Sequence, residues 1–519
     1  MTKLRSCPRR DGSLARAMVG LASWATFALS ATASFAFDTG HHSDLTREAL
    51  SDLGFSDTAI QVAQVENWLV DYYSNREAGV DDAIKIDCDK LHSDNLFDEA
   101  SVKNYWDRFT VNAKAAFTEA ARRKDPREVL ALLGISLHTV QDFYSHSNWA
   151  ELHAPPTGGP FDYATLTYFD ARSRAGVKTG QASSNHTPGQ TPHGGYDTGM
   201  NHDWYGKRNW DRAYVHAYAG SRQWSNQARL WVSAVDPAVW ERARQISLTE
   251  KQRAKLSQDH NAAYRISEWV KSGSEDGHWK GKGSGNLPAF LAFSSHWITL
   301  TTDSDFVEDF KNRSWHRLLS GGLRGSLDLG VNRPPPSPGP PIAILPIQKV
   351  AVVLTTHSVD DLDAADPIHG DGADFYAKVS IHNQPFIESV QNGHDHLKPP
   401  WITMKFLDAG TPFTAIHYEL WDEDTTSSDE HLDIEPRNGV TNLDFAYNLA
   451  TQHAAGINID GMFIDAQHPL VSRGTPGNHA EVKLSIATRT LGPAPRPNLP
   501  PVADPNTNTG AYSGPTNSP

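Results

Sequence analysis

The feature that most constrains the fold is a change of composition about two thirds of the way along the chain. Residues 333–341 read RPPPSPGPP, a composition typical of a semi-rigid linker. Before this run, apolar residues recur with the period of an α-helix, and after it short segments alternate with the period of a β-strand. The sequence therefore predicts two domains of different class, an all-α domain followed by an all-β sandwich.

Helical periodicity is clearest in residues 40–150 and returns in residues 210–256. Between them, residues 154–200 are rich in Gly, Pro, Thr, Ser and His and are expected to form a long loop. The expected organisation is a signal peptide at 1–36, a helical domain at 37–330, a linker at 331–346, a C2-like sandwich at 347–490 and a disordered tail at 491–519.

The N-terminus indicates export. A basic region at residues 3–16 precedes an apolar stretch at 17–35, and Ala36 completes a small-residue cleavage site. Cleavage there would make Phe37 the first mature residue of a secreted protein, extracellular or periplasmic; a membrane anchor is the alternative. Cys88 would then be the only mature cysteine, so no internal disulfide could form and bound metal could stabilise the fold instead.

The formal net charge of −14 argues against a general nucleic-acid binder, which normally presents a basic face. It does not exclude a nuclease, because a metal site can supply positive charge locally.

His138, Asp142 and His146 are spaced by four residues each. On a helix each such step drifts by only about 40°, so the three side chains can point into one site. Imidazole and carboxylate are natural zinc ligands, and the apolar residues around them predict a buried, rigid helix. The alternative is a polar helix face with ordinary histidines.

Residues 133–152, LGISLHTVQDFYSHSNWAEL, resemble the signature of the HET-C-like family. That family is similar to the zinc-dependent bacterial phospholipases C, whose core motif is LGxxxHxxxD. Further matches are NWLVDYYS at 67–74, LHSDN at 91–95 and HSDLTREA at 42–49. Four motifs in family order make the resemblance specific.

The resemblance implies an all-α fold with up to three zinc ions. Their ligands would be Phe37 through its N-terminal amine, His42, Asp71, His92, His138, Asp142, His146 and His216. Asp142 would bridge two ions, His146 and His216 would hold the third, and Asp71 would also act as the catalytic general base.

Some of these positions have alternatives. His41 could replace its neighbour His42, and His202 or Asp203 could replace a later ligand. Where the bacterial enzymes carry a Glu four residues after the later His, this chain has Gly220.

Two acidic segments of the C-terminal domain lie at the ends of expected strands, before FYAKV at 375–379 and within ELWDEDTTSSD at 419–429. Converging carboxylates suit calcium, although solvated acidic loops are the alternative. The pattern resembles a calcium-dependent, lipid-binding C2 domain. The residues that match best are Asp366, Asp374, Asp422, Asp424 and Asp429, with Glu430 as an alternative to the last.

Together these resemblances imply a secreted zinc-dependent phospholipase C with calcium as a second cofactor. It would split phosphatidylcholine-like lipids into diacylglycerol and a phosphorylated head group, and it would bind the membrane surface through the C2-like domain. A zinc nuclease of the related fungal type and a non-catalytic HET-C-like protein for lipid handling or recognition are the alternatives. Nucleic acid is not favoured as a partner, and the oligomeric state stays open.

Overall fold

A computed structural model describes most of both expected domains. The described residues are 39–74, 90–153, 176–181, 190, 200, 202, 209–271, 318, 347–362, 373–388, 395–399, 401–422, 429–437, 439–456, 459 and 461–491. Several predictions lie outside them: the signal segment 1–36, Phe37, most of the 154–200 loop, Asp203, the linker 331–346, Asp366, Asp424 and the tail after residue 491.

The N-terminal domain is helical, as expected. Its elements are α2 (Thr39–Ser51), α3 (Asp57–Ser74), η2 (Lys90–His92), α5 (Glu99–Arg122), α6 (Pro126–His146), α7 (Trp149–Leu152), α8 (Trp210–Ser233), α9 (Pro237–Arg244) and α10 (Glu250–Lys271). Helix α6 lies at the centre and packs against α3, α5 and α8. Every side chain from Glu128 to His146 is buried, so α6 carries its polar residues inside the domain.

Local sequence sets where these helices begin. The Asp125 side chain accepts a hydrogen bond from the Glu128 amide, and Pro126 occupies the first turn, where its missing N–H is not needed. Asp236 and Pro237 start α9 in the same way. The single helical stretch expected over residues 210–256 is therefore divided into three helices.

Gly134 lets α6 approach α3 closely. A Cβ at this position would lie 2.3 Å from the carbonyl oxygen of Ala63 and 2.9 Å from Cβ of Glu66. Only glycine fits such a contact. The close approach brings the next two turns of α3, which carry Asn67 and Asp71, opposite His138 on α6.

The C-terminal domain is an antiparallel β-sandwich, as expected. One sheet has the order β10-β11-β1-β4, with β5 also paired to β1, and the other has the order β3-β2-β6-β8-β9, with β7 paired to β6. The strands are β1 (Lys349–Asp361), β2 (Phe375–Ile381), β3 (Gln384–Ile387), β4 (His396–Leu397), β5 (Ile402–Asp408), β6 (Phe413–Asp422), β7 (Glu430–Leu432), β8 (Leu443–Asn448), β9 (Ala454–Ala455), β10 (Leu470–Arg473) and β11 (Ala480–Leu491).

Strand β6 shows why the sequence folds this way. Its alternate residues Ile416, Tyr418 and Leu420 are buried, while His417 and Glu419 face outward. This period of two gives the sheet one apolar face for the core between the sheets.

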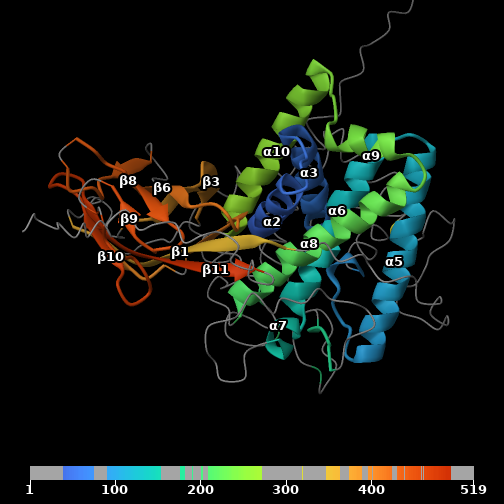
Figure 1. Cartoon of the computed structure of the whole chain (residues 1–519), viewed down its shortest axis with the longest axis horizontal. Coiled ribbons are helices and arrows are strands. Elements are labelled where there is room, and N and C mark those ends of the chain that lie inside the picture. Colours follow the sequence, from blue (N-terminus) through green and yellow to red (C-terminus); the bar gives the residue numbers. More distant parts are fainter. Residues whose placement is uncertain are drawn as a thin grey trace, which may run out of the picture.

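The two domains touch each other. Figure 1 shows α2 and α8 on the side of the helical domain that faces the strands, and Lys405 of β5 reaches Glu48 of α2. None of the helices in the described part of the chain combines the length and apolarity that a membrane crossing requires.

Candidate metal centre

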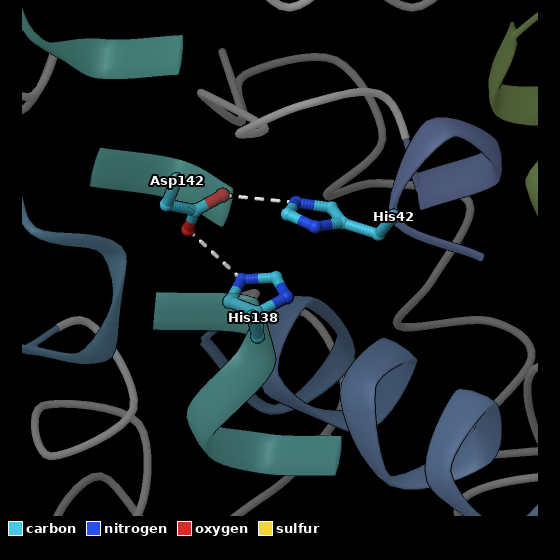
Figure 2. A group of neighbouring side chains, drawn as sticks. All are labelled: His42, His138 and Asp142. Carbon is cyan, nitrogen blue, oxygen red and sulfur yellow. Dashed lines mark ion pairs between the residues drawn. The ribbon is translucent and has the colours of Figure 1, made fainter. Parts of the chain in front are cut away.

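His42, His138 and Asp142 meet in the interior of the helical domain, from α2 and two successive turns of α6 (Figure 2). Nε2 of His42 lies 2.9 Å from Oδ1 of Asp142, and Nε2 of His138 lies 3.0 Å from Oδ2. All three residues are fully buried. The carboxylate of Asp142 thus presents one oxygen to each histidine, which is the arrangement that a bridging ligand needs.

A second group shares His138 and adds Asp71 of α3 and His92 of η2. Nδ1 of His92 lies 3.2 Å from Nε2 of His138 and 2.9 Å from Oδ2 of Asp142. Oδ1 of Asp71 lies 3.5 Å from the His138 nitrogen and 3.8 Å from the His92 nitrogen. Ligands on a tetrahedral zinc ion lie roughly 3.4 Å apart, given metal–ligand bonds of about 2.0–2.2 Å, so these separations suit zinc.

A buried amide pair orients the two α-helical histidines. Asn67 donates through Nδ2 to Oε1 of Gln141 at 3.1 Å and to Thr46, which leaves its Oδ1 as an acceptor. That oxygen accepts from Nδ1 of His138 at 3.1 Å, and Oε1 of Gln141 accepts from Nδ1 of His42 at 2.7 Å. Such hydrogen bonds fix the tautomer of metal-binding histidines.

The orientation of the two histidine rings indicates that a cation fits between them and Asp142. With Nδ1 of His42 and His138 donating to amides, each neutral ring turns the lone pair of Nε2 toward the Asp142 carboxylate. A lone pair facing a carboxylate oxygen at 2.9–3.0 Å is repulsive unless a proton or a metal ion lies between them. The donor set of imidazole nitrogens and carboxylate oxygens is the one that zinc prefers.

The pKa values of the three histidines show that the buried carboxylates favour positive charge in this site. Burial lowers the pKa of His92, but the hydrogen bond and charge of Asp142, together with Asp71 and Asp94, outweigh burial and raise the pKa to about 9. The pKa of His42 is also raised, because Asp142 outweighs burial there too. Burial takes the pKa of His138 down to about 3. In the absence of metal, the neighbouring carboxylates therefore favour the charged form of His42 and His92, whereas His138 stays neutral.

The loop after η2 contains Asp94, a residue beside the site that was not among the ligands expected from the sequence. Ser93 and Asn95 have left-handed backbone angles, with φ of 57° and 62°, which is unusual for residues other than glycine. This conformation turns His92 toward Asp142 and Asp94 toward His146. The LHSDN motif was the available signal, since Asp94 is part of it.

His146 supports this loop. Its Nδ1 lies 2.9 Å from Oδ1 of Asp94 and 3.0 Å from the main-chain oxygen of His92. A ring N–H at that position donates to the main-chain oxygen of His92, and the Asp94 carboxylate lies within ion-pair distance of the same nitrogen. Within the described residues, the two groups with metal-holding geometry include neither His146 nor His216.

His216 of α8 lies among aromatic rings. Its ring stacks on Tyr144 with centroids 5.9 Å apart and meets Trp149 edge-on at 6.3 Å. Gly220, one turn along α8, faces the same tyrosine, and a Cβ there would lie 2.5 Å from its ring. The Tyr144 ring therefore fills the space that a Glu at position 220 would need.

His41 and His202, the alternatives to the expected zinc ligands, contact other side chains instead. His41 packs its ring against Trp210, with centroids 5.1 Å apart, and lies outside both groups. His202 places Nε2 at 3.1 Å from Oε1 of Glu151.

In the sandwich, the structure brings the two acidic segments to one edge. The amide of Asp374 donates to Oδ1 of Asp422 at 2.6 Å, and the Tyr376 hydroxyl donates to Oδ2 of Asp429 at 2.7 Å. Asp422 also lies opposite Glu430 across the β6–β7 pair. These contacts place three of the five predicted calcium residues together, and the other two lie outside the described residues.

One protein-family model matches the chain, described as the VWA7 N-terminal domain, over residues 56–157. The match covers well under half of the chain and includes Asp71, His92, His138 and Asp142. The matching model is thus not that of a HET-C-like or zinc phospholipase C family. No curated protein shows significant similarity to the chain.

Similar solved structures include human GIVD cytosolic phospholipase A2, at 10% identity and a TM-score of 0.20, over 28% of this chain and 17% of that chain. A C2 domain of plant Extended Synaptotagmin 1 matches at 13% identity and a TM-score of 0.19, over 28% of this chain and 98% of that chain. A calcium-bound pair of C2 domains from Extended-Synaptotagmin 2 matches at 17% identity and a TM-score of 0.20, over 28% and 47%. The chain spans less than a fifth of the phospholipase, so its function has to be inferred from its own side chains.

Proposed function

We propose that the helical domain is a zinc-dependent phosphodiesterase of the phospholipase C type, acting on phosphatidylcholine-like lipids in an exported protein. The observation that carries the proposal is the bridging position of Asp142. Its two oxygens face separate histidine nitrogens at 2.9 and 3.0 Å, in a buried site that also holds Asp71 and His92.

The residues have distinct roles in this proposal. Asp71, His92 and His138 would hold one ion together with Oδ2 of Asp142, and Oδ1 of Asp142 would bridge to a second ion held by His42. Bound zinc makes water more acidic and stabilises negative charge on phosphate oxygens, which is the chemistry that phosphodiester cleavage needs. Asp71 would take the proton of the attacking water on its carboxylate, as a general base.

The sandwich would bring the enzyme to its substrate. Asp374, Asp422 and Asp429 offer carboxylate oxygens at one edge, and calcium binds through six to eight such oxygens. A calcium ion held there would attract anionic lipid head groups to a surface that is otherwise acidic.

The test is hydrolysis of phosphatidylcholine vesicles by the full chain after zinc loading, with the products identified by mass spectrometry. We expect diacylglycerol and phosphocholine from the wild type and neither from His138→Ala. His357→Ala, a histidine of the sandwich bonded to Ser485, is the matched control and should retain activity. Full activity of His138→Ala would overturn the site, and cleavage of single-stranded DNA in place of lipid would favour the nuclease.

One observation favours a second candidate, in which zinc is structural and the protein binds lipid without cleaving it. Asp71, His138 and Asp142 are at most 1% exposed, whereas a catalytic ion must be reached by substrate. Tightly bound zinc without turnover of any phosphodiester would support this candidate over the enzyme.

A further inference from the structure

The β-sandwich contacts the helix that carries His42. Helix α2 places His42 in its first turns and Glu48 in its last turns, and Asp52 follows directly after its end. Glu48 is 2% exposed, so its carboxylate is removed from water. A buried charge of this kind is costly unless a partner of opposite charge lies beside it.

The partner comes from the sandwich. Nζ of Lys405 on β5 donates to both carboxylate oxygens of Glu48, each at 2.8 Å, and the amide of Phe406 lies 3.4 Å from one of them. Burial raises the pKa of Glu48, while the lysine opposes that shift by favouring the charged form. The last turns of α2 are therefore bound by groups about 350 residues further along the chain.

A second cation acts at the end of the helix. Nζ of Lys349 on β1 lies 2.6 Å from Oδ1 of Asp52. The same carboxylate receives the Tyr218 hydroxyl and lies 3.5 Å from Nε of Arg222, both on α8. Asp52 thus joins α2, α8 and the sandwich at one point.

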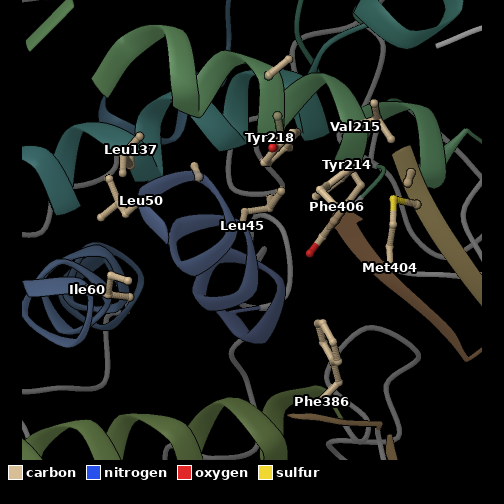
Figure 3. Packing of buried hydrophobic residues seen from close by; sticks show 14 of the residues in the cluster. Leu45, Leu50, Ile60, Leu137, Tyr214, Val215, Tyr218, Phe386, Met404 and Phe406 are labelled. Carbon is tan, nitrogen blue, oxygen red and sulfur yellow. The ribbon is translucent and has the colours of Figure 1, made fainter. Parts of the chain in front are cut away.

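Aromatic and apolar side chains complete the contact. Figure 3 shows Phe406 and Met404 of β5 beside Tyr214 and Tyr218 of α8. The Phe406 and Tyr218 rings stack with centroids 3.8 Å apart and an angle of 8° between their planes. All of these side chains are buried, so separation of the domains would expose an apolar surface as well as a charged one.

From these contacts we infer that the sandwich is a structural part of the metal centre, and that Lys405 and Lys349 are positioning residues that hold α2 so that His42 stays on Asp142. The inference rests on the metal centre of the proposed function, but not on catalysis. It predicts that loosening the sandwich weakens the ion at His42, while the ion at Asp71 and His92, which no residue of α2 binds, stays in place.

The test compares three variants of the full chain. Lys405→Met removes the cation and leaves the Glu48 carboxylate buried beside an apolar chain. Glu48→Met/Lys405→Met replaces the whole pair with apolar side chains, an exchange that is often close to neutral for stability. Lys483→Met, an exposed lysine of β11, is the matched control.

The readouts are zinc affinity and stoichiometry by competition with a chelator, and deuterium exchange of peptides covering residues 39–51. For Lys405→Met we expect the affinity for the zinc ion at His42 to fall about ten-fold to a hundred-fold, as for other residues that orient metal ligands. Exchange in α2 should rise in the metal-free protein, and the double variant should recover most of both losses.

Two results would overturn the inference: Lys405→Met that matches Lys483→Met in both readouts, or faster exchange in α2 with wild-type affinity for every zinc ion. If Lys405→Met does not fold, Lys349→Met is measured in its place against the same criteria. A wild type that binds no zinc would contradict the metal centre itself, and α2 exchange would still show whether the sandwich holds the helix.

Discussion

Oδ1 of Asn67 accepts a hydrogen bond from Nδ1 of His138 at 3.1 Å, and this bond decides which nitrogen of the ring faces Asp142. Without it the ring could rotate or change tautomer. The amide on α3 therefore orients a potential metal ligand on α6.

Asn67→Leu should weaken zinc binding about ten-fold to a hundred-fold, because it removes the acceptor that orients His138. Zinc competition with a chelator measures the change. Asn226→Leu is the control, since Asn226 is buried on α8 but bonds only to Arg229 among the contacts described for it. Equal affinities in the two variants would contradict the orienting role of Asn67.

Zinc should stabilise the folded chain against heat. An ion that binds only the native state adds about 2.7 kcal/mol to the unfolding free energy at a hundred-fold excess over its dissociation constant. Calorimetry with zinc and with a chelator measures the shift in Tm. His138→Ala should lose the shift, because both groups of ligands share His138; an unchanged shift would place the zinc elsewhere.

Metal-free protein should lose stability as the pH rises from about 6.5 to about 9. The pKa of His92 is raised to about 9 in the folded state, so its protonated form stabilises the fold below the unfolded value and that contribution is lost as pH passes the folded value. His42 shifts in the same direction, and His138, with a pKa lowered to about 3, does not titrate in this window. Urea unfolding at several pH values checks this, and a flat profile would contradict it.

Gly220→Ala should destabilise the helical domain by about 1–3 kcal/mol, because the new methyl group collides with the Tyr144 ring 2.5 Å away. Denaturant unfolding measures the loss. Gly220→Ala combined with Tyr144→Leu should cost less than the sum of the two single changes, since the ring that causes the collision is gone. Strict additivity would show that the ring is not the cause.

Asp422→Asn should weaken calcium-dependent binding to anionic vesicles without changing zinc content. Asp422 is 4% exposed and holds the Asp374 amide, so the substitution removes charge from the acidic edge and alters its geometry. Vesicle sedimentation with calcium and with chelator measures binding. Asp444→Asn, which changes an exposed aspartate of β8, should bind as the wild type does; equal binding by both variants would argue against calcium at this edge.

Much of the fold could be predicted because its signals are local. The spacing of His138 and Asp142 places both on one face of a helix, and the alternation of residues 416–421 identifies a strand, whatever the rest of the chain does. The division of the two domains followed from the same periodicities.

Other features depend on contacts that no local pattern reports. Lys405 and Glu48 are 357 positions apart, and nothing near either residue indicates the other. Asp94 lies beside His146 in a loop where Ser93 adopts a left-handed conformation that its residue type does not favour. The family match covers residues 56–157, which leaves out His42 as well as the whole sandwich.

Strand β1 runs from one end of the sandwich to the other. Its first residue, Lys349, lies beside Asp52 of the helical domain, and its last, Asp361, pairs with Ala480. The neighbouring His479 bridges to Asp433, just after β7, and β7 pairs with Asp422 at the acidic edge.

A strand of 13 residues is about 40 Å long at roughly 3.3 Å per residue. A molecule standing upright on its acidic edge would therefore hold the metal centre about one bilayer thickness above the lipid. If the acidic edge and the metal centre both act on lipid as proposed, the protein would have to lie along the membrane, with β1 nearly parallel to its surface.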